Sequence, residues 1–175
     1  MPDAAHAPTP TLARRLDATG VPLLLARLVL GGVFIWLGSN KLAEPITFLK
    51  LIREYGLVPE SLPWLLNTMA VALPWLEIWC GLLLLAGVAV RGTGYGMLLL
   101  LMVFSGAILL RALDIQAAEQ LAFCAIKFDC GCGTGEEYVC SKLPQNLGLM
   151  ALTGLVVWSR TQRFCLRPNL FGSSR

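Results

Sequence analysis

The sequence predicts an all-α integral membrane protein, built as a four-transmembrane-helix bundle. Two observations lead to this fold class. Hydrophobic residues make up 56% of the 175-residue chain and charged residues only 14%, and the apolar residues gather in long runs. A soluble domain carries roughly 25% charged residues, so this chain lacks the charge to cover a surface that faces water. Its length allows one domain.

Four apolar stretches approach the roughly 20 residues that a spanning helix needs. They cover residues 21–41, 64–90, 92–113 and, more weakly, 147–158, which helical periodicity extends to 144–164. Three spans plus a surface helix are the alternative. The membrane domain is therefore expected at 21–164. It would lie between a polar tail at 1–20, which lacks the apolar run of a signal peptide, and a second short tail at 165–175.

Small residues in these stretches predict that the helices pack closely, because they let helix backbones approach each other in lipid. The glycines concerned are Gly31, Gly32, Gly38, Gly81, Gly87, Gly92, Gly96, Gly106, Gly148 and Gly154.

Two connections are long enough to carry structure of their own. Within 42–63, the segment 45–55 places Phe48, Leu49, Ile52 and Tyr55 on one helical face and its charged residues on another. This amphipathic pattern predicts an interfacial helix after the first span. The connection 114–143 is a cysteine-bearing loop between the third and fourth helices, and its part 117–128 is expected to form a second surface helix.

The charge distribution bounds the partners and the orientation. A net charge of +3 is too small to indicate a nucleic-acid partner, and the single histidine, His6, makes a His-based metal site unexpected. Lys and Arg residues outside the spans are slightly more numerous on the side of the two termini. The positive-inside rule therefore favours cytoplasmic termini and a periplasmic cysteine loop in a bacterial inner membrane.

Four cysteines within this loop predict its chemistry: Cys124, Cys130, Cys132 and Cys140. Structural zinc sites use pairs of cysteines two to four residues apart, and this spacing lacks them, so metal is the least favoured use. Two disulfides that staple the loop are the simplest use. Thiol–disulfide exchange is the third possible use. It is favoured because a disulfide closed across the single residue between Cys130 and Cys132 would be strained and easily reduced.

Polar residues in the spans form a second candidate site. Glu77 lies near the centre of the second span, where an ionisable group costs about 3 kcal/mol, so it should face the bundle and find a partner. Lys41, Asn40 and Arg111 are the candidates for that partner, whereas Arg27 is expected to snorkel towards the membrane surface. Glu77 is then either a structural polar contact or a proton or quinone site.

Several segments together resemble the MauE (methylamine utilisation protein) family within the DoxX-like membrane superfamily. The resemblance covers roughly residues 21–160, and its motifs follow in the family's order. They are 27–34, 38–42, 55–59, 74–81 with Glu77, 82–87, Arg91, the Cys-Gly-Cys run at 129–133 and Asn146.

The resemblance implies a four-helix membrane protein with a redox role for Cys130 and Cys132. Members are implicated in maturing the disulfide-rich small subunit of periplasmic methylamine dehydrogenase, together with a thioredoxin-like partner, MauD. An accessory redox protein is therefore expected rather than a stand-alone enzyme. Cys124 and Cys140 lie outside the family pattern, and stapling is expected of them.

Two alternatives remain open at this point. One is a small DoxX-like subunit of a quinone-linked oxidoreductase, the only reading that requires a cofactor. The other is a non-catalytic structural subunit with a disulfide-stapled loop. All three readings place the protein in the lipid bilayer.

Overall fold

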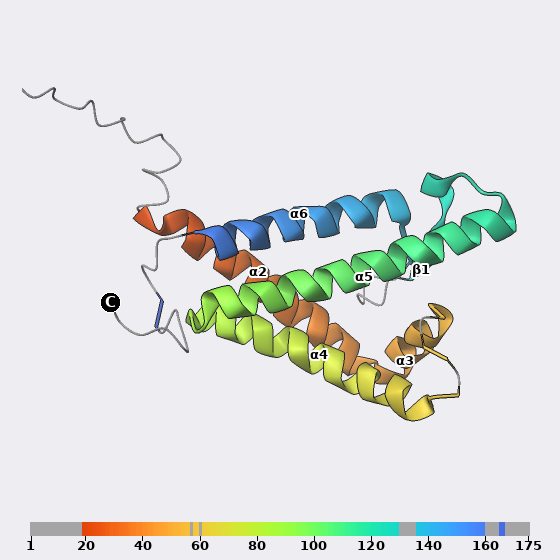
Figure 1. The fold of residues 1–175 in the computed structure, drawn as a ribbon, viewed down its shortest axis with the longest axis horizontal. Coiled ribbons are helices and arrows are strands. Elements are labelled where there is room, and N and C mark those ends of the chain that lie inside the picture. The colour runs from red at the N-terminus through yellow and green to blue at the C-terminus, as the bar shows by residue number, and fades with distance from the viewer. Residues whose placement is uncertain (1–18, 57, 60, 130–135, 160–164, 167–175) are drawn as a thin grey trace, which may run out of the picture.

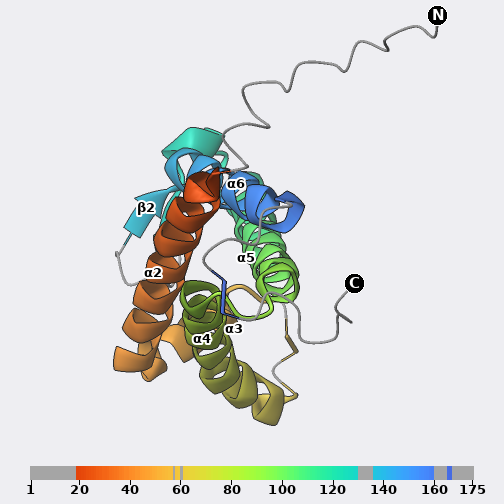
Figure 2. The ribbon, with the colours of Figure 1, turned by 90° about the vertical axis from the view of Figure 1, so that its left-hand side faces the viewer.

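Four long helices lie side by side in the computed structural model, which describes residues 19–56, 58, 59, 61–129, 136–159, 165 and 166 (Figure 1). They are α2 (Val21–Ala43), α4 (Pro63–Ala86), α5 (Val90–Glu119) and α6 (Val139–Trp158). Seen along the bundle (Figure 2), each helix contacts two neighbours, in the circular order α2, α4, α5, α6.

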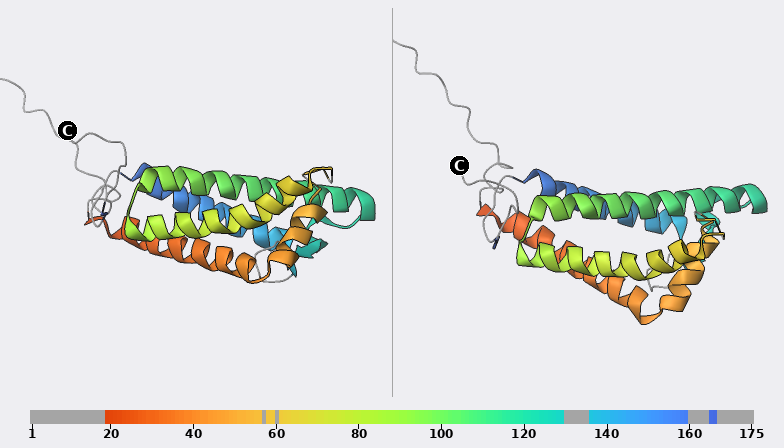
Figure 3. Two further views of the ribbon diagram at one scale, coloured as in Figure 1. Left: turned by 90° about the horizontal axis from the view of Figure 1, so that it is seen from below. Right: turned by 60° about the horizontal axis from the view of Figure 1, so that its bottom comes forward.

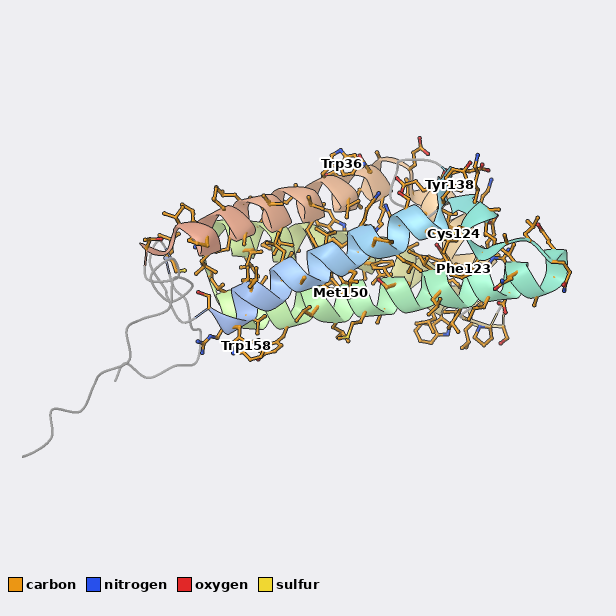
Figure 4. All side chains as sticks on the ribbon, turned by 90° about the horizontal axis from the view of Figure 1, so that it is seen from above. Trp36, Phe123, Cys124, Tyr138, Met150 and Trp158 are labelled. Carbon is orange, nitrogen blue, oxygen red and sulfur yellow. A yellow bond between two sulfur atoms is a disulfide. The ribbon has the colours of Figure 1, made fainter. Side chains whose placement is uncertain are left out.

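Three of these helices, α2, α4 and α5, are long and apolar enough to cross a membrane, with mean hydropathies of 2.0, 1.9 and 2.2 over their most apolar windows. Large apolar side chains point away from the bundle, among them Trp36, which is 51% exposed, and Trp158, which is 84% exposed (Figure 4). Such side chains suit a lipid-facing surface. The chain is therefore a multi-pass membrane protein, and membrane crossing by α6 stays a prediction.

The first three helices were predicted in place, with ends that shift by a few residues. The fourth begins earlier than expected, at Val139, and ends at Trp158. The turn between α4 and α5 is tight because Gly87 adopts a left-handed conformation, with φ 70°, at the end of α4, a backbone geometry that glycine tolerates best.

The interface between α2 and α4 depends on glycines, as the sequence indicated. A Cβ atom on Gly81 would lie 2.8 Å from the Gly31 carbonyl oxygen, and one on Gly38 would lie 2.7 Å from the Pro74 carbonyl oxygen. These helices therefore touch backbone to backbone. The prediction does not extend to every glycine, because a Cβ atom at some of them would meet nothing within 4 Å. These are Gly32, Gly92, Gly106, Gly148 and Gly154.

The first long connection forms helix α3 (Pro45–Glu54), which lies across the ends of α2 and α4 (Figure 3). Phe48 and Ile52 are buried against Leu66 and Ala70 of α4. Part of the amphipathic face is thus covered by protein. Its position at the bilayer interface stays a prediction.

The prediction of a second surface helix at 117–128 was wrong. Helix α5 continues to Glu119 instead, and the chain leaves it at Gln120, which has a φ of 54°. Ala-rich sequence favours this continuation, and the aromatic and β-branched residues that follow favour extended structure. After α5 the chain forms a 3-10 turn, η1 (Phe123–Ala125), and the first strand of an antiparallel hairpin, β1 (Lys127–Asp129). Its second strand is β2 (Glu136–Tyr138).

The base of the hairpin packs against the C-terminal part of α5. Ile126 and Val139 pack with Ala112 of α5 in one buried cluster. The start of α2, the α4–α5 turn and the end of α6 lie at the opposite end of the bundle (Figure 1). The fold therefore separates the cysteine hairpin from the described residues nearest the two termini.

Candidate functional site

The cysteine hairpin lies at one end of the bundle, and in the sequence its two strands border the predicted redox segment. Its strands pair with Lys127 opposite Tyr138 and Asp129 opposite Glu136. In the sequence Cys130 directly follows Asp129. Residues 130–135, including both predicted catalytic cysteines, lie outside the described part of the chain, so the roles of Cys130 and Cys132 stay predictions.

A disulfide joins Cys124 in η1 to Cys140 in the first turn of α6, with the two Cα atoms 5.1 Å apart. A second link lies beside it, where the Val139 backbone N–H donates to the Ile126 carbonyl oxygen at 3.2 Å. Both links lie at the base of the hairpin, where Figure 4 places Phe123, Cys124 and Tyr138 together. The disulfide therefore ties the hairpin base to α6.

Two lysines near the hairpin already have partners. The Lys142 ammonium lies 3.3 Å from Oε2 of Glu137. The Lys127 ammonium lies 4.6 Å from the centre of the Tyr138 ring. Lys127 is at the end of β1 that is farther from Cys130, so its charge is placed at the hairpin base.

Glu77 pairs with Lys41, one of its three predicted partners. The Lys41 ammonium donates to Oε1 of Glu77 at 2.5 Å, and the two side chains are 3% and 4% exposed. Gly38 allows this approach, since a Cβ atom there would lie only 3.2 Å from Glu77 Cβ. The other candidates, Asn40 and Arg111, are both half-buried.

Aromatic rings complete the surroundings of the buried ammonium. Lys41 Nζ lies 4.3 Å from the centre of the Phe104 ring and 5.3 Å from that of Phe48. A cation over an aromatic face is stabilised by the ring's electron distribution, most strongly where water is excluded. The carboxylate and the two rings together offset the cost of burying this charge.

Two residues that were not among the predicted site residues extend the polar cluster to the other two helices. Asn146 of α6 donates from its side-chain amide to the Ser105 hydroxyl of α5 at 3.0 Å. Asn146 also lines a small cavity beside Lys41 and Glu77. The signal in the sequence was a polar amide directly before the apolar run of the last helix, within the stretch 144–164 to which helical periodicity extends it; a polar group in lipid is costly unless it is paired.

The prediction that Arg27 snorkels towards the membrane surface was wrong. Arg27 is 1% exposed, and its guanidinium donates to the carbonyl oxygens of Leu84 at 2.8 Å and Leu85 at 3.0 Å. The last carbonyls of a helix lack helical partners and carry its partial negative charge. At the end of α4, Arg27 donates to two of these carbonyls, of which the Leu84 carbonyl also accepts from the Gly87 backbone N–H. Arg27 also donates to Sγ of Cys165 at 3.2 Å.

Comparison with models of known protein families identifies the family of this chain. The family model described as "Methylamine utilisation protein MauE" matches residues 19–159. The chain belongs to the MauE family. No curated protein and no solved structure matches it. This MauE-family protein is thus a methylamine utilisation protein of the membrane.

Proposed function

We propose that this MauE-family protein is an accessory redox protein for periplasmic protein maturation, in which Cys130 and Cys132 exchange disulfides with a thioredoxin-like, MauD-like partner. The client in methylamine utilisation would be methylamine dehydrogenase. The observation that carries the proposal is the stapled hairpin at one end of the helix bundle, whose strands border the Cys-Gly-Cys segment in the sequence.

The chemistry is a two-electron exchange between thiols. The thiolate of one cysteine attacks a disulfide of the partner, forms a mixed disulfide and releases one partner thiolate. The second cysteine then attacks the mixed disulfide. The products are a Cys130–Cys132 disulfide and a partner carrying two thiols, and the reverse sequence reduces this protein again.

The hairpin supports separate roles for the two cysteine pairs. Each strand has three residues, and a strand of that length rises about 10 Å. Cys124 and Cys140 lie at the base of the strands, whereas Cys130 follows the far end of β1. In the proposal, the first pair staples the hairpin and the second pair reacts with the partner.

The proposed topology places four spanning helices in the bacterial inner membrane, with cytoplasmic termini and a periplasmic hairpin. The start of α2 and the end of α6 lie at the opposite end of the bundle from the hairpin (Figure 1), which supports it. So does the Cys124–Cys140 disulfide, because disulfides persist in the periplasm and are rare in the cytosol.

Trapping of mixed disulfides tests the proposal. A Cys132→Ala or Cys130→Ala variant, produced in cells with the thioredoxin-like partner, should accumulate an adduct that a reductant dissolves. Cys80→Ala is the matched control, because Cys80 is a free thiol packed against the bundle core. If neither loop variant traps a protein, the exchange reaction is refuted. A maleimide that cannot cross the inner membrane, applied to intact cells before and after reduction, tests the topology.

A structural subunit with a stapled loop is the second candidate, and the Cys124–Cys140 disulfide favours it. The two candidates differ in the double variants. A structural role predicts that Cys130→Ala/Cys132→Ala preserves growth on methylamine, whereas the redox role predicts that growth is lost. The cavity at Glu77 has a volume of about 30 Å³, which is too small for a quinone ring, so we propose no quinone site there.

A further inference from the structure

We propose that the cavity beside the Lys41–Glu77 pair binds a single water molecule, which completes a polar network through all four long helices. The cavity is lined by Lys41 of α2, Glu77 of α4, Asn146 of α6 and apolar side chains that include Phe34 and Phe104. This site is independent of the proposed redox function.

The first argument is an unsatisfied acceptor. Glu77 is 3% exposed, and its Oε1 accepts from Lys41. Its other oxygen, Oε2, is buried and has no hydrogen-bond partner among the described residues. A buried polar atom without a partner is costly, most of all on a charged group. A donor in the cavity would remove this cost.

The second argument is size. The cavity volume is about 30 Å³, and a cavity needs roughly 10–15 Å³ to hold a water molecule. There is room for one water but not for an organic ligand with an aromatic ring. The volume of the cavity therefore limits its ligand to a molecule of about the size of water.

The third argument is charge. The carboxylate of Glu77 is already neutralised by the Lys41 ammonium. A second cation would leave the site with an excess positive charge in a low-dielectric interior, which is strongly unfavourable. A neutral donor suits the site, and water is the neutral donor of the right size.

Asn146 gives the water a further partner. A buried water is stable when it makes two to four hydrogen bonds to polar groups, and three of the residues that line the cavity have polar side chains: Glu77, Lys41 and Asn146. Asn146 in turn donates to Ser105 of α5. The water would thus connect the α2–α4 ion pair with the α5–α6 hydrogen bond.

Radiolytic footprinting of the full-length protein in lipid nanodiscs tests the site. Hydroxyl radicals formed from a bound water oxidise the side chains beside it even where bulk solvent has no access. Phe34, which is 2% exposed, lines the cavity, and Phe48, which is 4% exposed, is a matched phenylalanine that does not. We expect Phe34 to be oxidised several-fold faster than Phe48. Equal rates would overturn the proposal.

A cavity-filling variant separates bound water from leakage of bulk solvent. Leu101→Phe places a larger side chain in the cavity wall and should reduce Phe34 oxidation to the rate of Phe48. If this variant does not fold, Asn146→Leu removes one polar partner and should have the same effect. Fast oxidation of Phe34 that persists in a folded variant would show that the radicals come from bulk water, and would refute the site.

Discussion

Replacing Glu77 by Gln should lower the free energy of unfolding by about 3–5 kcal/mol, the cost of removing one partner from a buried ion pair. The structure places this pair at the upper end of such effects. The two charged atoms are 2.5 Å apart and both side chains are at least 96% buried. Gln keeps an oxygen that can accept from the Lys41 ammonium but carries no negative charge, so the buried cation loses its counter-charge and keeps the two ring contacts.

A double variant distinguishes the interaction energy between Lys41 and Glu77 from the effect of each single substitution. Lys41→Met/Glu77→Met replaces both charges with apolar side chains, and such replacements are often neutral or stabilising. The double variant should therefore lose less stability than either Lys41→Met or Glu77→Met alone. The coupling energy, which is the sum of the two single losses minus the loss in the double variant, should then exceed the larger single loss and be at least about 3 kcal/mol.

Unfolding by sodium dodecyl sulfate in mixed micelles, followed by circular dichroism, measures these differences. Lys127→Met is the control, because this lysine is exposed and its ammonium lies over the Tyr138 ring, a contact worth about 0.5–1 kcal/mol at an exposed site. A loss below 1 kcal/mol in Glu77→Gln, or a double variant whose loss equals the sum of the single losses, would refute the reasoning.

Three further predictions concern the helix contacts and the disulfide. Gly38→Ala should lower the melting temperature, since its Cβ would overpack against α4 at a cost of about 1–3 kcal/mol, whereas Gly32→Ala, with nothing within 4 Å, should not. Arg27→Met should cost about 2 kcal/mol in the same unfolding assay by removing the Arg27 donor from the Leu85 carbonyl oxygen, and Arg27→Lys should not restore the loss because one ammonium cannot reproduce the planar fork. Cys124→Ala/Cys140→Ala opens a link of sequence separation 16, worth about 3 kcal/mol, and should make the hairpin sensitive to protease while helical circular dichroism is unchanged.

The helices were predictable because their signal is local. Long apolar runs predicted α2, α4 and α5, and the amphipathic pattern predicted α3, although α4 ends at Ala86 and not at 90, and α5 continues to Glu119 and not 113. The segment 117–128 was not predictable in the same way. Its Ala residues favour helix and its aromatic and β-branched residues favour strands, and the packing of Ile126 and Val139 on Ala112 involves residues far apart in the sequence.

The candidate site shows the same limit. The cost of a charge in lipid indicates that Glu77 needs a partner, but Lys41, Asn40 and Arg111 were equally available in the sequence. The choice follows from the glycine contacts between α2 and α4, which bring Lys41 to Glu77. Arg27 was misplaced for a similar reason, because its acceptors are backbone carbonyls, which every residue has.

The Cys124–Cys140 disulfide has a consequence for how the chain is assembled in the membrane. Helix α6 is not among the three helices whose apolarity alone suits membrane crossing, so in the proposed four-span topology its insertion would receive the least help from lipid. Cys140 lies in its first turn and Cys124 lies just after α5. Once the bond closes, the start of α6 is held beside the end of α5. In the proposed topology, where the hairpin faces the periplasm, closing this bond would fix the direction of α6 relative to α5 after synthesis.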